Sequence, residues 1–318
     1  MIVLQLKSTQ DGTALASISS IIKILKKDCN YRVRGHEIHQ TQDVMATTTL
    51  RERVDRVSRF CARNELDYLA YHAPIFGRGQ NIWEDAWREK IKQSIGLTLE
   101  EASRVKSEAG MPSTAIVVFH LTNYVHKDRL PTTIEEKLRM FKAAEDEFMR
   151  FGFDYSVGNC VLALENTYPR YDNGFANAGP FHPRELVRME RHGIKTALDI
   201  AHYQLYANYL KSGRGNPIGN IDRKEYRQAP SWRQCLNILA KSLALLHISD
   251  ARGLTVEGEG LPLGQGEIPL LQVLREAGSG RTMQGTLELN GGHLGNGELQ
   301  LESAKWLLYN AGDVFGCP

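Results

Sequence analysis

Several features that would assign a chain to a membrane or to an oxidising compartment are missing from this sequence. No run of about 18 apolar residues is present, so we expect no membrane-spanning helix. The cysteines are scattered, odd in number and form no CxxC pair; they are Cys29, Cys61, Cys160, Cys235 and Cys317. This pattern favours reduced thiols. Because MIVLQLKSTQ also lacks the layout of a signal peptide, the sequence predicts a cytoplasmic protein.

A strong charge of either sign is missing as well. Lysine and arginine together number 39, against 37 for aspartate and glutamate, which gives a formal net charge of +2. Proteins held mainly by phosphate contacts are usually far more basic, so nucleic-acid binding stays open without being favoured. No GxGxxG motif follows the first predicted strand, and a dinucleotide-binding fold thereby loses its main support.

The sequence does contain a regular alternation of apolar runs with longer amphipathic stretches. The runs that predict strands are Ile2–Leu6, Arg32–His39, Tyr68–His72, Ala115–His120, Val161–Glu165, Thr196–His202, Leu243–Ile248 and Met283–Leu289. The stretches that predict helices include Leu50–Asn64, Trp83–Ala109, Ile134–Phe151, Pro183–Arg191, Trp232–Lys241 and Ser303–Asn310. Helix-sized segments between strands imply parallel pairing through βαβ units.

Eight such units predict an α/β fold, a (β/α)₈ TIM barrel that residues 1–318 form as one domain. An open doubly wound sheet is the alternative. One long polar connection, at about residues 211–230, follows the sixth predicted strand and is expected to be an insertion.

Six consecutive predicted strands carry ionisable side chains at the same end. In chain order these are His72, His120, Glu165, Asp199 with His202, His247 with Asp250, and Glu288. The corresponding ends of parallel barrel strands converge on one face. Converging carboxylates and imidazoles are costly unless a cation joins them, so the pattern predicts a divalent metal centre with oxygen and nitrogen ligands. A single such residue would more often be a hydrogen-bonded rim residue, and the prediction depends on the repetition.

These segments resemble the xylose isomerase-like barrel superfamily, which contains sugar isomerases and epimerases and also the endonuclease IV enzymes that cleave DNA at abasic sites. The likeness covers nearly the whole chain and is strongest from Tyr68 to Asn290. On the isomerase side, it implies one divalent ion (Mn, Mg, Co or Zn) bound by Glu165, Asp199, His247 and Glu288. Glu165 and Glu288 would then be the catalytic acid and base, and His202 of the D-x-x-H unit would face the substrate.

On the endonuclease side, the resemblance adds His72 in YHAP and His120 in VFHLTN as ligands of a second metal. LENT, at Leu164–Thr167, also resembles that family's fifth strand. The third ion of those enzymes needs an Asp-x-His arm after strand seven, where aligning LPLGQG places Gly258 and Gly260. The missing arm leaves His202 without its expected partners and favours sugar chemistry.

The sequence therefore predicts a metal-dependent sugar or sugar-phosphate isomerase or epimerase, which transfers a proton next to a metal-bound carbonyl. Two alternatives remain open. One is an abasic-site endonuclease with a two-metal centre, and the other is a dehydratase or lyase acting on a keto-polyol. The expected partner is a small carbohydrate, and a homo-oligomer is compatible with the sequence.

The remaining candidates are substrate contacts. In GHEIHQ, strand alternation places Glu37 and His39 on one face and His36 on the other. Further candidates follow the predicted strands at the active face: they are Asn166, Asp250, Arg252 and Glu259. The basic residues that the endonuclease alternative would use for phosphate contacts are Arg32, Arg34, Arg78, Arg214, Arg223 and Arg227.

Overall fold

A computed structural model describes residues 1–77, 79–80, 85–121, 124–150, 160–213, 226–292 and 295–316. Several expectations fall on residues outside these ranges. They concern Arg78, Arg214, Arg223, Cys317 and most of the predicted insertion, residues 214–225.

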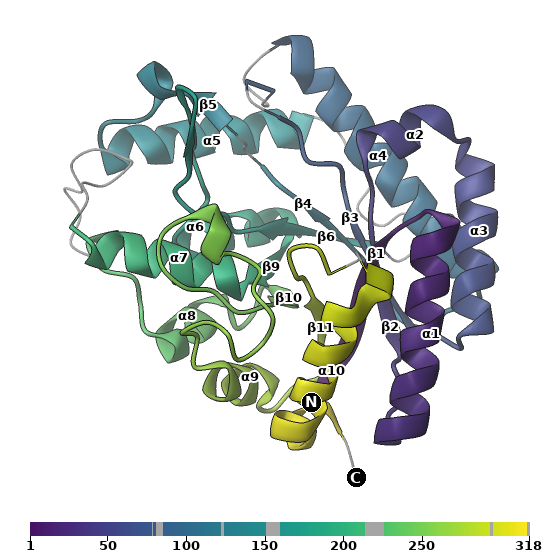
Figure 1. The fold of residues 1–318 in the computed structure, drawn as a ribbon. Helices are drawn as coiled ribbons and strands as arrows, with labels where there is room; N and C mark the ends of the chain where they lie inside the picture. Colours follow the sequence, from purple (N-terminus) through teal and green to yellow (C-terminus); the bar gives the residue numbers. More distant parts are fainter. Residues whose placement is uncertain are drawn as a thin grey trace.

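Eight parallel strands close into a barrel in the order β1-β11-β10-β9-β6-β4-β3-β2 (Figure 1). The strands are β1 (Ile2–Thr9), β2 (Gly35–His39), β3 (Tyr68–His72), β4 (Ala115–Phe119), β6 (Cys160–Glu165), β9 (Lys195–Asp199), β10 (Leu243–Ile248) and β11 (Met283–Leu287). Because β1 pairs with both β2 and β11, the sheet has no free edge. The predicted (β/α)₈ barrel is confirmed, and the open sheet is excluded.

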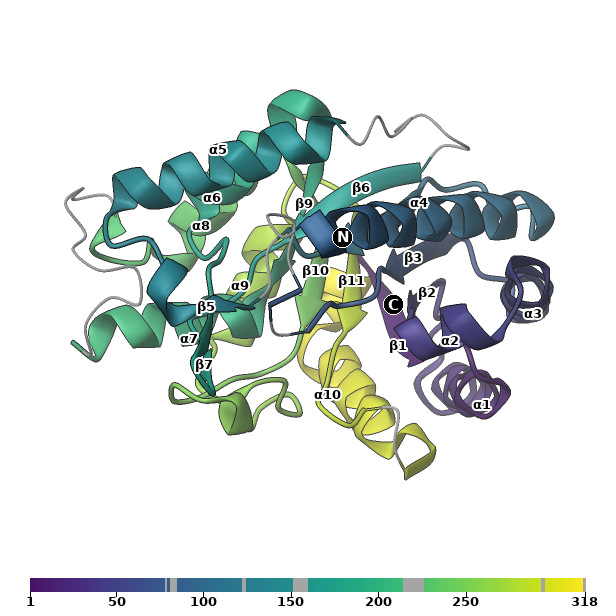
Figure 2. The same cartoon turned by 90° about the horizontal axis from the view of Figure 1, so that it is seen from above.

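The helices surround the strands, as Figure 2 shows from above. They are α1 (Gly12–Cys29), α2 (Gln42–Thr47), α3 (Leu50–Arg63), α4 (Asp85–Glu108), α5 (Ile134–Arg150), α6 (Pro183–Leu186), α7 (Ile200–Lys211), α8 (Trp232–Leu239), α9 (Leu270–Gly278) and α10 (Glu298–Phe315). Helix α3 illustrates the local causes: Thr49 and Glu52 form a capping box at its start. Its apolar positions, among them Val54, Val57 and Phe60, are buried against the barrel.

The sixth predicted strand, Thr196–His202, is wrong at its end. The strand stops at Asp199, whose carboxylate caps α7 by accepting the His202 backbone N–H at 2.7 Å. The apolar run continues through Ile200 and Ala201, so hydrophobicity alone did not reveal the change from strand to helix. His202 therefore lies in the first turn of a helix.

Alternation along β1 sends its residues to two different environments. Ile2, Leu4 and Leu6 belong to the apolar layer between strands and helices. Gln5 faces the barrel interior, where it contacts Gln284 and Thr286 of β11. Lys7, two residues further on, has the same parity as Gln5. The alternation thus carries a lysine into the C-terminal end of the barrel.

A small antiparallel sheet that the sequence did not predict stands beside this end of the barrel. It has the order β5-β8-β7, formed by Tyr124–His126, Phe175–Asn177 and Tyr171–Asp172. Thr167, just after β6, donates its hydroxyl to Asn177 at 3.2 Å and so joins this sheet to the barrel.

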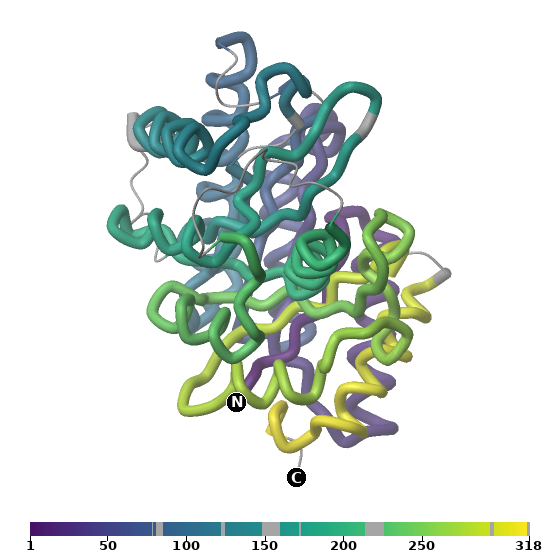
Figure 3. Tube along the Cα trace, turned by 90° about the vertical axis from the view of Figure 1, so that its left-hand side faces the viewer, coloured from purple at the N-terminus to yellow at the C-terminus, as the bar shows by residue number. Residues whose placement is uncertain are grey.

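Met1 and the C-terminal end of α10 lie near each other (Figure 3). The Met1 amino group donates to the carbonyls of Gly278 and Arg281 at 2.7 and 2.8 Å. Among the described residues, no helix is long and apolar enough to cross a membrane.

Candidate metal centre

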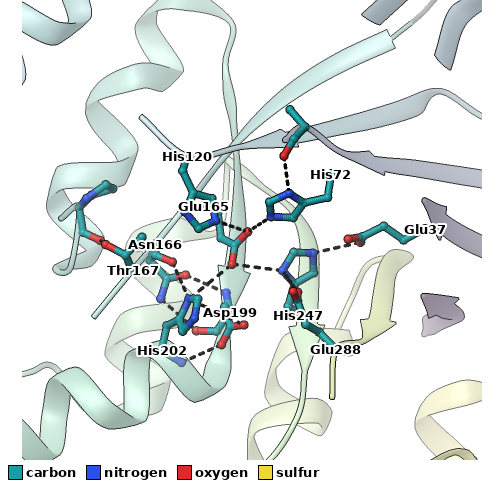
Figure 4. A network of polar contacts seen from close by, with 12 residues as sticks. Glu37, His72, His120, Glu165, Asn166, Thr167, Asp199, His202, His247 and Glu288 are labelled. Atoms are coloured by element: carbon teal, nitrogen blue, oxygen red, sulfur yellow. Dashed lines mark hydrogen bonds and ion pairs between the residues drawn. The ribbon is translucent and has the colours of Figure 1, made fainter. Parts of the chain in front are cut away.

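Each of the eight barrel strands, near its end or one residue beyond it, contributes one ionisable side chain to a largely buried group at the C-terminal end of the barrel. In chain order these are Lys7, Glu37, His72, His120, Glu165, Asp199, His247 and Glu288. Figure 4 shows seven of them pointing toward one another. The convergence predicted from six strands is present in the structure, and β1 and β2 add to it.

Four of these residues form a group that could hold a cation. Glu165, Asp199, His247 and Glu288 each offer one ligand atom, and these atoms all lie within 4.8 Å of one another. His247 Nδ1 is 2.5 Å from Glu288 Oε2, so these two ligand atoms are in direct contact. Three carboxylates this close in a buried setting suit a divalent ion.

Burial and the repulsion among the three neighbouring carboxylates both act on the pKa of Asp199. Burial, together with the nearby carboxylates of Glu165 and Glu288, raises the pKa of Asp199 to about 6. Its Oδ1 is used by the cap of α7, which leaves the rest of the carboxylate for the group of four. A cation at this position would relieve the repulsion among the three carboxylates.

A second group shares Glu165. His72, His120 and Glu165 also present ligand atoms within 4.8 Å of one another. Nε2 of His72 and Nε2 of His120 lie 3.0 and 3.1 Å from Glu165 Oε2. His72 Nδ1 is 2.8 Å from the Ala73 carbonyl, to which it can only donate. Burial lowers the pKa of His72, and in its neutral form Nε2 is then an acceptor that faces another acceptor. A cation between Nε2 and the carboxylate resolves this conflict.

Glu37 contacts the four-ligand group through His247. Its Oε2 lies 3.0 Å from His247 Nε2, so the imidazole donates there and keeps Nδ1 free for an ion. Burial alone would raise the pKa of Glu37, but His247 and Lys7 lower it to about 2. Glu37 thus orients a candidate ligand, a different task from the predicted substrate contact.

Lys7 is the main site residue that the sequence analysis missed. Its ammonium lies 2.8 Å from Glu37 Oε1 and 2.6 Å from Glu288 Oε1, and its side chain is only 10% exposed. The available signal was one lysine within the strand IVLQLKST, at a position with interior parity.

The glycine-rich loop after β10 reaches the site through Glu259. Glu259 Oε1 lies 2.9 Å from His202 Nε2, and the Tyr168 hydroxyl donates to Glu259 Oε2 at 2.5 Å. His202 thus has Glu259 as a partner from this loop, in place of the missing Asp-x-His arm. Gly258 permits this path, because a Cβ there would lie 1.9 Å from the Arg252 carbonyl oxygen.

Three other predicted substrate contacts do not point into the group of candidate ligands: two side chains bind backbone groups, and one is exposed on a loop. The Asp250 carboxylate accepts backbone N–H groups from Ala251, Gly264, Gly266 and Ile268 and so organises the loop. Arg252 is exposed on the same loop. The Asn166 side chain is fully buried and bonds the backbone of Asp199 at 2.7 and 3.0 Å, which clamps β6 to β9. In a sequence, side chains that bind backbone cannot be told from those that bind substrate.

Two cavities open onto the candidate ligands. One of about 250 Å³ is lined by residues that include Lys7, His39, Asp199, Ser249, Glu259 and Glu288. The other, of about 140 Å³, lies over His72, His120, Glu165 and His202, and it shares Glu259 and Glu288 with the first. The His39 ring also stands 4.9 Å from the His72 ring. Both cavities are smaller than typical ligand pockets and leave room only for a small molecule.

Two of the predicted phosphate contacts lie at the opposite end of the barrel. Arg34 precedes β2 and pairs with Asp67 before β3 at 2.6 Å, while Arg32 lies 3.9 Å from Glu65. Strands β2 and β3 begin there, so these arginines are remote from the site.

Solved structures with a similar fold are known, although the sequence itself has no match. No family model and no curated protein matches the sequence. The structure is similar to the TTHB071 protein from Thermus thermophilus, soaked with ZnCl₂, at 16% identity and a TM-score of 0.63 over 98% of this chain and 99% of that chain. It is similar to a xylose isomerase domain protein from Planctomyces limnophilus at 13% identity and a TM-score of 0.59, covering 99% of both chains. It is also similar to D-psicose 3-epimerase with D-tagatose from Clostridium cellulolyticum, at 11% identity and a TM-score of 0.59 over 99% of both chains.

These likenesses confirm the predicted resemblance to xylose isomerase-like barrels at the level of the fold. Within the described residues, the chain combines that fold with two side-chain groups that could hold metal ions.

Proposed function

We propose that this protein is a divalent-metal-dependent enzyme that isomerises or epimerises a small carbohydrate. One observation carries the proposal: the group of Glu165, Asp199, His247 and Glu288 borders cavities of small-molecule size. The likeness to an epimerase that has been studied with D-tagatose supports the choice of substrate class.

Within this site, an ion held by the four residues would polarise a substrate carbonyl and make the neighbouring C–H more acidic. Glu288 is the accessible carboxylate, because its side chain is 29% exposed and lines both cavities. It would take the proton from that carbon or return it. Glu165 is buried and would act from the other side. The two glutamates together would provide the base and the acid.

His202 and Glu259 would orient the substrate. His202 lines the smaller cavity, and its Nδ1 is 2.9 Å from the Asn166 carbonyl, which fixes the ring. His202 Nε2 and Glu259 Oε1 lie 2.9 Å apart, and a substrate hydroxyl that separated them would accept from the imidazole and donate to the carboxylate. Lys7 and His39 line the larger cavity and would bind oxygens of the remaining carbon chain.

A second candidate function is hydrolysis of a phosphate ester, including the phosphodiester at an abasic site in DNA. The group of His72, His120 and Glu165 favours it, because one carboxylate shared by two ligand groups is suited to a two-metal centre. Sugar isomerisation does not need this second group.

The experiment that separates the candidates has two parts. The purified protein is incubated with ketoses and ketose phosphates in D₂O, with Mn²⁺, Mg²⁺, Co²⁺ or Zn²⁺, and products are examined by mass spectrometry. Deuterium next to the carbonyl supports the first proposal, while loss of water indicates a dehydratase. In parallel, an abasic-site duplex is incubated with the same ions. Nicking that a chelator abolishes, without any change in the sugars, would overturn the first proposal.

A further inference from the structure

Lys7, Glu37, His247 and Glu288 form a closed ring of four close polar contacts. Lys7 Nζ lies 2.8 Å from Glu37 Oε1, and Glu37 Oε2 lies 3.0 Å from His247 Nε2. His247 Nδ1 lies 2.5 Å from Glu288 Oε2, and Glu288 Oε1 lies 2.6 Å from Lys7 Nζ. Both oxygens of both carboxylates and both imidazole nitrogens take part. Figure 4 shows the part of the ring from Glu37 through His247 to Glu288.

Three of the four side chains in the ring are nearly or fully buried, and Glu288 is 29% exposed, so the charges are only weakly screened by solvent. The side chains of Glu37 and His247 are fully buried, and that of Lys7 is 10% exposed. The Lys7 ammonium lies between the carboxylates of Glu37 and Glu288, and it compensates two negative charges that would otherwise repel each other.

Glu288 belongs both to this ring and to the candidate metal group. Lys7 therefore forms an ion pair with the same carboxylate that an incoming cation needs as a ligand. Two cations that share one carboxylate at low dielectric oppose each other. A ring that only oriented Glu288 would strengthen ion binding, whereas a competing charge weakens it.

We propose that Lys7 is a built-in counter-cation, which stabilises the site when no ion is bound and by the same charge limits how tightly the site holds an ion. The inference rests on the proposed metal-binding function of the four-ligand group. It holds for either candidate reaction, and it makes the ion exchangeable.

The test compares Lys7→Met with two controls. Lys7→Arg keeps the charge. Lys137→Met removes another buried lysine, which is 1% exposed and pairs with Glu185 at 2.7 Å outside the site. For each protein, the dissociation constant for Mn²⁺ is measured by competition with a chelating dye. The melting temperature is recorded in chelator and in saturating Mn²⁺.

Lys7→Met is expected to bind Mn²⁺ about tenfold more tightly than the wild type, or more tightly still. Its melting temperature should fall in chelator and recover in Mn²⁺, because the two effects are linked. Lys7→Arg should retain an affinity close to that of the wild type. Lys137→Met should be destabilised equally in both conditions, with unchanged affinity.

Unchanged or weaker Mn²⁺ binding by Lys7→Met would overturn the inference and leave Lys7 as an orienting residue. Wild-type protein that binds no ion would instead defeat the proposed function, so the two failures are distinguishable. If Lys7→Met does not fold, Lys7→Gln applies the same criterion, since its amide still donates to a carboxylate but carries no charge. Tighter binding by Lys7→Gln supports the inference, and equal or weaker binding overturns it.

Discussion

The two halves of the site differ in how their ligands are supported. In the half formed by the ends of β6, β9, β10 and β11, three carboxylates and one imidazole are supported by Glu37, Lys7 and the cap of α7. On the side of β3 and β4, two imidazoles meet the single carboxylate of Glu165, and the Ala73 carbonyl orients one of them. The first half carries enough negative charge to demand a cation, whereas the second half depends on a shared ligand. We therefore expect the four-ligand half to bind its ion more tightly.

Breaking both halves at once should have the largest effect. Glu165→Gln removes the carboxylate common to the two groups, so bound metal and activity should both be lost, activity by roughly 10³-fold. Metal content by mass spectrometry and turnover measure the two losses. Glu101→Gln is the matched control, because Glu101 is also a buried carboxylate but pairs with Arg53 outside the site, at 2.6 Å. Normal metal content in Glu165→Gln would contradict the shared-ligand interpretation.

Breaking the four-ligand half alone should have the next largest effect. Glu288→Gln keeps the shape of the side chain but removes an anionic ligand and the accessible acid–base group. Turnover should fall by roughly 10²-fold or more, with the fold preserved, as judged by circular dichroism. A variant with near-normal turnover would show that Glu288 transfers no proton.

Removing the charge of Glu37, which orients His247 in the four-ligand half, should have a smaller effect on metal binding. Glu37→Gln keeps an oxygen that accepts the His247 N–H but removes its charge. The affinity for Mn²⁺ should fall by roughly tenfold to 100-fold, as is typical when the partner of a metal-bound histidine is altered. Equilibrium dialysis measures the change. Affinity equal to that of the wild type would mean that His247 needs no charged partner.

Breaking the histidine half should have the smallest effect, if the protein is an isomerase or epimerase. His72→Ala and His120→Ala should then reduce sugar turnover by less than roughly tenfold, because the four-ligand group stays intact. Steady-state kinetics on the active sugar give the comparison with Glu288→Gln. Losses as large as that of Glu288→Gln would favour two-metal chemistry and the second candidate function.

The sequence was sufficient for the barrel and for the convergence of its ligands, because both depend on short-range patterns. Strand alternation and position at a strand end are local properties, and they located Glu165, His247 and Glu288 without any knowledge of the tertiary structure. Alternation also separated Glu37 from His36, whose ring packs 5.0 Å from Phe60 on the outer side.

Contacts between segments that are distant in the chain could not be predicted from the sequence. Lys7 meets Glu288 across 281 residues, and Glu259 meets His202 across 57. No local pattern encodes either pairing. The backbone partners of Asn166 and Asp250 were not predictable for a related reason, since only the folded chain defines the positions of those backbone groups. The small β5-β8-β7 sheet joins loops after two different strands and was missed for the same cause.

The four hydrogen bonds that Asp250 accepts have a consequence for the dynamics of the glycine-rich loop. Gly264 and Gly266 lie where the composition suggests rapid motion, yet their amides are held by a carboxylate that is 1% exposed. Hydrogen exchange at these amides requires the carboxylate to release them, so it reports opening of the loop as a unit. Because the same loop positions Glu259 beside His202, slow exchange there would mean that the wall of the site is already formed before a substrate arrives.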